Sequence, residues 1–424
     1  MFGSFSVLFV SLSFLVLAVN PSAAEGFTRL RKAGRILKRS PVILVPGDLG
    51  NRLEAKLNKP SSSYKVCTLK TPNYINLWLN PLEIAFDLKC WVENMRLVYD
   101  NQTRKTSNMP GVDVRVPGFG GTETVEIIDP NLILSPRLTH FLSFKYYFKD
   151  IVDSLVGAGY VRNVSVRGAP YDFRKAPNEM QDYYKKLKNL IEETFLKNNK
   201  TKVTIVCHSM GCAITSYFLN TKDQAWKDKH IKGLITLGPA LGGAVKALKT
   251  IAAGENLGYK VDAGQLKLQQ RSTVSLSYLV PSRHLWSPNE VIAFTKHKNY
   301  TVKNYDEFFK DIGFSTAFEM YKDTFRYAEI GLNPPGVEVF CIYGVGLNTT
   351  IRLNYTQPKS FPDKPVLEFG EGDGTVNLRS LQVCSNWRGR QKQKVFLKTL
   401  PKVEHLDMLR DEYVKKFIVD YVTS

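Results

Sequence analysis

The chain has 424 residues, 43% hydrophobic and 23% charged, a composition typical of a globular protein with a sizeable core and not of a disordered chain. Its 58 Lys and Arg residues against 39 Asp and Glu give a net charge of +19. Because no nucleic-acid-binding motif accompanies this charge, we expect an anionic phospholipid membrane surface as the partner, and no nucleic acid.

Residues 1–24 are typical of a secretory signal peptide, since an apolar run at 7–19 is followed by small residues that end at Ala24. The run is too short to span a bilayer. We therefore expect a mature protein that is soluble in the secretory pathway. Six Asn-x-Ser/Thr glycosylation sites agree with that route. They are Asn101, Asn163, Asn199, Asn299, Asn348 and Asn354.

The basic segment 25–40 has two interpretations, a lipid-touching arm or a disordered segment that is trimmed, and we favour the second. The core then starts at 41–66 with a short buried strand at 41–46, followed by the loop Gly47-Asp48-Leu49-Gly50. Hydrolases of α/β architecture place one oxyanion donor in such a loop. An ordinary strand-to-loop turn would contain the same glycines.

Segment 67–98 is an aromatic-rich insert that we expect a disulfide to close. Its apolar residues fit a hydrophobic subdomain, and they also fit a face presented to a bilayer interface. We predict a membrane-binding insert. The membrane contacts expected are Leu77, Trp78, Leu79 and Trp91.

The rest of the chain alternates strands with amphipathic helices, which favours a mostly parallel sheet covered on both faces. We assign 99–243 to the core with the nucleophile, 244–336 to a cap with a mobile lid, and 337–424 to the end of the core. Strands are expected at 164–166, 203–207, 231–237, 337–343 and 395–397. Helices are expected at 143–156, 178–196, 210–219 and 406–422.

The stretch Cys207-His208-Ser209-Met210-Gly211 lies between the strand at 203–207 and the helix at 210–219. This arrangement predicts a nucleophile elbow, a tight turn that exposes the serine oxygen and directs the next backbone N–H at an oxyanion. Cys207 stands where the commonest pattern has glycine.

A catalytic serine needs a base, and in α/β-hydrolases the base follows the nucleophile and the acid in the chain. Of the later histidines, His230 is at a Lys-rich helix end, while His284 and His297 fall in the irregular cap. His405 lies between the last strand and the last helix, so we predict that it is the base.

Asp373 is the predicted acid because it lies in a glycine-flanked loop between the last two core strands. Glu371 is the nearest competitor and Asp363 is a weaker one. A turn aspartate that caps its own backbone would give the same Asp-Gly sequence.

Six cysteines allow fifteen complete pairings. We expect Cys207 and Cys212 to remain reduced, because they flank the proposed nucleophile on a strand and a helix that should diverge. The other four pair most simply in chain order, Cys67 with Cys90 and Cys341 with Cys384. No metal-ligand spacing is present, so we expect no metal and no cofactor.

The whole mature chain resembles the lecithin:cholesterol acyltransferase family, and within it the lysosomal phospholipase A2 branch. The motifs that carry the resemblance are 46–51, 114–120, 168–172, 208–211, 372–377 and 404–405, together with Asn101. The chain departs from the family pattern in two places, at Cys207 and in the sequence Gly238-Pro239-Ala240-Leu241.

The resemblance implies an α/β-hydrolase fold with a catalytic triad of Ser209, Asp373 and His405. It also implies an oxyanion hole built from the backbone N–H groups of Asp48 and Met210, the two disulfides above, a membrane-binding subdomain and a lid.

The implied activity is calcium-independent cleavage of a phospholipid acyl ester through an acyl-Ser209 intermediate. Water or a lipid acyl acceptor such as ceramide then takes the acyl group. The alternatives are a sterol acyltransferase of the lecithin:cholesterol type and a catalytically silent lipid-binding protein.

Overall fold

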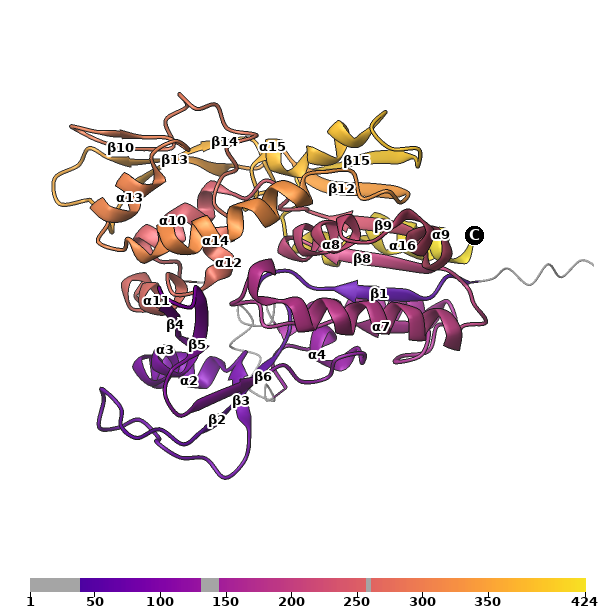
Figure 1. The fold of residues 1–424 in the computed structure, drawn as a ribbon, viewed down its shortest axis with the longest axis horizontal. Helices are drawn as coiled ribbons and strands as arrows, with labels where there is room; N and C mark the ends of the chain where they lie inside the picture. Colours follow the sequence, from indigo (N-terminus) through magenta and orange to yellow (C-terminus); the bar gives the residue numbers. More distant parts are fainter. Residues whose placement is uncertain (1–38, 131–144, 257–260) are drawn as a thin grey trace, which may run out of the picture. The chain divides into compact units, whose positions relative to one another are not determined.

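A computed structural model describes residues 39–130, 145–256 and 261–424. The predicted signal peptide and nearly all of the basic segment lie outside these residues. The centre of the molecule is a six-stranded sheet in the order β15-β12-β9-β8-β1-β7, in which every neighbouring pair is parallel (Figure 1). Its strands are β1 (Val42–Val45), β7 (Val166–Gly168), β8 (Val203–His208), β9 (Ile231–Leu237), β12 (Val339–Val345) and β15 (Val395–Pro401).

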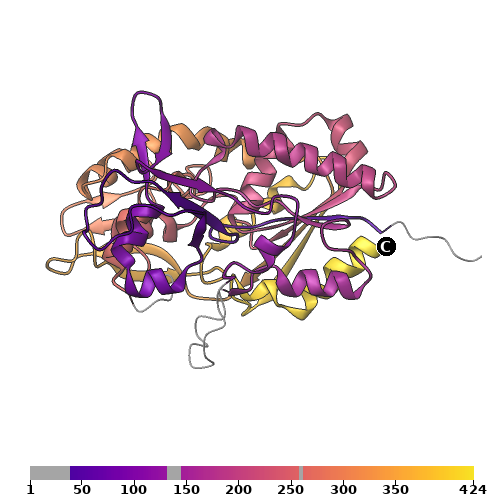
Figure 2. The same ribbon diagram turned by 90° about the horizontal axis from the view of Figure 1, so that it is seen from below.

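The sheet forms because its inner strands are largely buried runs, as a parallel sheet covered on both faces requires. Strands β1 and β8 are buried at every residue, and β9 and β12 at all but one and two residues. Helices α6 and α16 lie against one face and α7 against the other (Figure 2). This arrangement confirms the predicted α/β-hydrolase class. The covering helices, with the helix after β8, are α6 (Lys149–Gly157), α7 (Gln181–Lys197), α8 (Met210–Asn220) and α16 (Glu412–Thr423).

The predicted cap has a sheet of its own, in the order β11-β10-β13-β14. Its last two strands, β13 (Thr349–Tyr355) and β14 (Val366–Gly370), come from beyond the predicted boundary at 336, so the cap draws on residues that we had assigned to the core. Part of the predicted lid, 257–260, lies outside the described residues. The other cap elements are β10 (Ala293–Thr295), β11 (Asn299–Tyr300), α10 (Val245–Ala253), α11 (Ala263–Gln270), α12 (Val274–Tyr278), α13 (Tyr305–Asp311) and α14 (Thr316–Gly331).

The predicted insert is closed by the disulfide Cys67–Cys90, whose Cα atoms are 5.3 Å apart. Its helices are α2 (Pro81–Phe86) and α3 (Leu88–Met95), and β3 (Ile75–Trp78) pairs with β2 (Leu53–Leu57), which also pairs with β6 (Val112–Arg115). The remaining elements are β4 (Leu97–Asp100), β5 (Lys105–Asn108), α4 (Glu123–Glu126), α9 (Gln224–His230), α15 (Leu378–Leu381) and the 3-10 helices η2 (Pro177–Glu179), η3 (Val383–Trp387) and η4 (Asp407–Leu409).

The four predicted membrane contacts are wrong, because Leu77, Trp78, Leu79 and Trp91 are each at most 1% exposed. Trp78 packs against Trp91 and Phe173, and its indole N–H donates to the carbonyl of Leu49 at 2.8 Å. The indole N–H of Trp91 donates to the carbonyl of Leu77 at 2.9 Å. These side chains therefore join the insert to the core instead of facing a bilayer.

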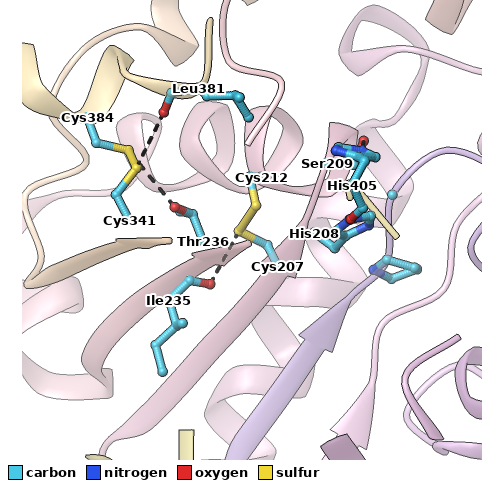
Figure 3. The surroundings of a disulfide bond; sticks show 12 residues. Cys207, His208, Ser209, Cys212, Ile235, Thr236, Cys341, Leu381, Cys384 and His405 are labelled. Carbon is cyan, nitrogen blue, oxygen red and sulfur yellow. Dashed lines mark hydrogen bonds between the residues drawn. A yellow bond between two sulfur atoms is a disulfide. The ribbon is translucent and has the colours of Figure 1, made fainter. Parts of the chain in front are cut away.

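All six cysteines are in disulfides, including Cys341–Cys384. The prediction that Cys207 and Cys212 stay reduced is wrong, because the structure joins them (Figure 3). Cys212 lies in the first turn of α8, where the chain has only begun to leave the strand, so its Cα is 4.9 Å from that of Cys207. That separation is within the range that a disulfide spans.

None of the helices within residues 39–130, 145–256 and 261–424 has both the length and the apolar character that a membrane span requires.

Candidate active site

Ser209 occupies the tight turn between β8 and α8. Its backbone has φ 54° and ψ −126°, a conformation that costs a non-glycine residue free energy and that recurs at functional sites. Two nearby positions, Gly47 and Gly211, have no room for a side chain. A Cβ on Gly211 would lie 2.2 Å from the carbonyl oxygen of Pro46, and a Cβ on Gly47 would lie 2.7 Å from the Cβ of Ser209. The loop after β1 thus packs directly against the elbow.

Ser209, His405 and Asp373 form a continuous hydrogen-bonded row. The distance from Ser209 Oγ to His405 Nε2 is 2.9 Å, and the distance from His405 Nδ1 to Asp373 Oδ2 is 2.6 Å. A carboxylate can only accept, so Nδ1 carries the proton and Nε2 is free to accept from the serine hydroxyl. This tautomer is the one in which His405 can act as a base toward Ser209.

Asp373 is held in place by its own loop. Its second carboxylate oxygen, Oδ1, accepts hydrogen bonds from the backbone N–H groups of Thr375 at 3.1 Å and Val376 at 2.8 Å. Its carbonyl accepts from the N–H of His405 at 3.0 Å. Asp373 is fully buried and His405 is 4% exposed, so water has little access to the bond between them.

The competing residues lie elsewhere. Glu371 is exposed and accepts a hydrogen bond from the N–H of Gly346, while Asp363 pairs with Lys267. His284 is exposed and faces Glu329. His297 is also exposed, and His230 packs against Trp226.

A cavity of about 310 Å³ opens beside Ser209 and His405. Most of the cavity wall is apolar, and an apolar wall fits a fatty acyl chain better than a small polar substrate. The charged side chains in the lining are Asp48, Lys246, Glu255, Glu404 and Arg410. The apolar part of the wall includes Trp91, Ile128, Phe173, Leu276, Leu279 and Leu409.

The loop Gly47-Asp48-Leu49-Gly50 forms another part of this wall. It closes through a hydrogen bond from the N–H of Gly50 to the carbonyl of Gly47 at 3.1 Å. Burial raises the pKa of the Asp48 carboxyl from 3.8 to about 7, although a hydrogen bond from the backbone of Leu49 acts in the opposite direction. Met210 is the first residue of α8, and N–H groups in the first turn of a helix have no acceptor within the helix.

Two residues that line the cavity were not assigned a role from the sequence, Tyr147 and His208. The hydroxyl of Tyr147 contacts Nδ1 of His208, and Nε2 of His208 lies 3.0 Å from the carbonyl oxygen of His405. Within the part of the chain that the structure describes, no three His, Cys, Asp or Glu side chains are grouped so that they could hold a metal ion.

Comparison with known proteins agrees with the resemblance noted from the motifs. The lecithin:cholesterol acyltransferase family profile matches residues 74–329 and 327–412. Lysosomal phospholipase A and acyltransferase of Homo sapiens is 44% identical over 390 residues, which cover 90% of this chain and 91% of the human one. Phosphatidylcholine-sterol acyltransferase of Mus musculus is 40% identical over 371 residues, covering 87% of this chain and 82% of the mouse one.

Among solved structures, the Tle4-Tli4 complex matches with a TM-score of 0.49 and 12% identity, covering 91% of this chain and 98% of that chain.

Proposed function

The chain belongs to the lecithin:cholesterol acyltransferase family, and we propose that it is a serine phospholipase A and transacylase with Ser209 as its nucleophile. The observation that carries this proposal is the hydrogen-bonded row Ser209–His405–Asp373 at the wall of an apolar cavity. A nucleophile beside a base, with the base oriented by an acid, is the arrangement that covalent acyl transfer requires.

In the first half of the reaction, Ser209 Oγ attacks the carbonyl carbon of a phospholipid acyl ester while His405 Nε2 takes the hydroxyl proton. The tetrahedral intermediate places its negative oxygen at the backbone N–H groups of Asp48 and Met210. His405 returns the proton to the departing oxygen, and the lysophospholipid leaves with that proton. The acyl group remains as an ester on Ser209.

In the second half, His405 removes a proton from water or from the hydroxyl of a lipid alcohol such as ceramide. The oxygen of that acceptor attacks the acyl-enzyme, and the proton returns to Ser209 as the ester breaks. The mechanism uses the chain's own side chains and backbone throughout, so we propose that the enzyme needs neither calcium nor a cofactor.

The membrane surface that we propose is the exposed side of the insert, and it consists of other residues than the sequence suggested. Val66 is 84% exposed and Phe86 80%, and Leu69 and Leu82 are also exposed. Phe86 ends α2, and the disulfide Cys67–Cys90 ties the segment that contains Val66 to α3. We call Val66, Leu69, Leu82 and Phe86 the insertion patch. Exposed lysines that flank it in sequence are Lys65, Lys70 and Lys89.

These lysines and the net charge of +19 favour an anionic phospholipid surface. Glycan attachment on the secretory route fits five of the six sites, because Asn101, Asn163, Asn199, Asn299 and Asn348 are exposed, whereas Asn354 is half-buried. We propose the lysosome lumen or the extracellular space as the location.

The test is hydrolysis of phosphatidylcholine in anionic liposomes at acidic and at neutral pH, with ceramide present or absent. We expect free fatty acid without ceramide, acylated ceramide with it, and neither from Ser209→Ala. Full activity of Ser209→Ala would refute the assigned nucleophile.

A sterol acyltransferase is the second candidate, because the mouse relative carries that name at 40% identity. Offering cholesterol and ceramide together separates the two, since product formed only on cholesterol would favour the sterol enzyme. A silent lipid-binding protein would fail to react with a fluorophosphonate probe.

A further inference from the structure

His208 is a buried histidine beside the catalytic base that the triad does not use. It ends β8, immediately before Ser209, and is 1% exposed. Its ring lies against that of His405 with centroids 4.7 Å apart, and both residues are seen beside Ser209 in Figure 3. Its two ring nitrogens contact Tyr147 and the backbone of His405, and neither is part of the row from Ser209 to Asp373.

The partners of these groups fix the direction of each hydrogen bond. A carbonyl oxygen can only accept, so His208 Nε2 carries a proton and donates it to the carbonyl of His405. Burial, together with the neighbouring His405, lowers the pKa of His208 well below its ordinary value, so the ring is neutral and Nδ1 is bare. Tyr147 therefore donates its hydroxyl proton to Nδ1.

The hydroxyl of Tyr147 also contacts the loop Gly47-Asp48-Leu49-Gly50, which we call the oxyanion loop. The oxygen of Tyr147 accepts a hydrogen bond from the backbone N–H of Gly47 at 3.0 Å. One unbroken path thus runs from Gly47 through Tyr147 and His208 to the carbonyl of His405, and every donor on it has an acceptor. The path joins two loops that lie far apart in the chain. One is the oxyanion loop after β1, and the other is the loop after β15 that contains His405, which we call the His405 loop.

The oxyanion loop is also shaped around the tyrosine ring. A Cβ on Gly50 would lie 2.6 Å from Tyr147 Cζ, and a Cβ on Gly47 would lie 2.8 Å from the tyrosine oxygen. Tyr147 is buried, at 6% exposure, and the loop has no side chain at either contact. The ring therefore supports the backbone on both sides of Asp48, while the hydroxyl sets its position through Gly47.

We propose that Tyr147 and His208 are positioning residues that hold the oxyanion loop and the His405 loop in register with Ser209. The inference rests on the proposed function, because it gives a role to the Asp48 N–H in the same reaction. Neither residue contacts the ester. Their contribution is to keep the stabilising donor and the base at the distances that the transition state needs.

The test is Tyr147→Phe, which removes one oxygen and keeps the ring that supports Gly50. We expect kcat on a soluble p-nitrophenyl ester to fall by about tenfold to a hundredfold, with KM changed by less than about twofold, because misplacement affects the transition state more than substrate binding. His208→Gln, which keeps a donor but lacks the Nδ1 acceptor, should have an effect of similar size. Since the two residues act as one path, the double variant should be little worse than either single variant.

The matched control is Tyr160→Phe. Tyr160 is also buried, at 3% exposure, and its hydroxyl donates to the backbone carbonyls of Ser40 at 2.9 Å and Val422 at 3.1 Å, away from the described site. We expect this variant to lose thermal stability while kcat stays unchanged. If Tyr147→Phe and Tyr160→Phe affect kcat equally, or if Tyr147→Phe keeps the wild-type kcat, the positioning role is refuted.

The soluble ester separates this inference from the proposed function. Wild-type protein that cleaves the soluble ester but not phospholipid would overturn the proposed substrate and leave the kcat comparison valid. Wild-type protein that cleaves neither and resists a fluorophosphonate would overturn both. If His208→Gln does not fold, the comparison of the two tyrosine variants decides alone.

Discussion

Asp48 lies in the wall of the cavity beside Ser209, and its backbone N–H is one of the two donors proposed for the oxyanion. Burial raises its pKa from 3.8 to about 7, so the carboxyl is neutral below that pH and ionised above it. Two like charges about 4 Å apart repel by about 1 kcal/mol in water and about 4 kcal/mol near a protein surface. An ionised Asp48 therefore opposes the oxyanion, and activity should fall as the pH rises through about 7.

Asp48→Asn removes the charge and keeps the shape. We expect the variant to keep its activity above neutral pH, where the wild type loses roughly tenfold or more. The measurement is the pH profile of kcat/KM for both proteins. The free energy of unfolding gives a second measurement. Because the pKa of Asp48 is higher in the folded protein than in the unfolded chain, the wild type loses stability as the pH rises from 3.8 towards about 7. Asp48→Asn should not show this loss. If kcat/KM of Asp48→Asn falls above neutral pH as it does in the wild type, the role given to the Asp48 carboxyl is contradicted.

The three catalytic candidates could be found from the sequence because chain order and local loop composition point to them. Ser209 follows a buried strand, Asp373 lies among glycines, and His405 follows the last strand. Tyr147 and His208 could not be found in this way. They are 61 residues apart in the chain, and what makes them interesting is a contact that exists only after folding.

At the scale of elements, apolar periodicity located the sheet well. The strand expected at 231–237 is β9, Ile231–Leu237, and that expected at 203–207 is β8, which extends one residue further to His208. Helix boundaries were less accurate. The helix expected at 143–156 begins at Lys149 within the described residues, and that expected at 406–422 is divided into η4 and α16.

The insert shows why composition alone misled. Trp78 and Trp91 have the aromatic character of bilayer anchors, but an apolar side chain leaves water equally well for lipid or for protein. Here Phe173 and the carbonyl groups of Leu49 and Leu77 meet the two tryptophans, which settles the choice in favour of the core. Those partners are set by tertiary packing, which the local sequence does not report.

The disulfide Cys207–Cys212 joins the end of β8 to the first turn of α8 and so spans the elbow that carries Ser209. We expect peptide mapping without reduction to find these two cysteines linked. Replacing both with alanine should lower the unfolding free energy by about 2 kcal/mol, the contribution expected for closing so short a loop. Denaturant unfolding of the double variant and the wild type measures this difference.

A single replacement serves as the control, since Cys212→Ala leaves Cys207 as a buried thiol without the bond. The cross-link accounts for the loss if the single and double variants are destabilised to a similar degree. Alkylation of both cysteines in protein denatured without a reductant would show that the pair is reduced, and would restore the original prediction.

At the scale of the whole molecule, net charge and the insertion patch act together. A charge of +19 attracts the protein to anionic lipid over a distance limited by salt, whereas the patch contributes only after contact. Binding to anionic vesicles should therefore weaken as the salt concentration rises, and binding to neutral vesicles should depend on salt far less. Co-sedimentation with vesicles measures both.

Replacing Leu82 and Phe86 together with serine removes apolar area from the patch without touching the active site. Burying one such side chain contributes about 1.5 to 3 kcal/mol, so the double variant should bind anionic vesicles at least about tenfold more weakly. It should cleave a soluble ester at the wild-type rate, because the substrate then needs no membrane. Leu196→Ser is the control, since Leu196 is 62% exposed near the end of α7 and lies outside the insert. Equal loss of vesicle binding in both variants would mean that exposed apolar area in general, and not this patch, attaches the enzyme to lipid.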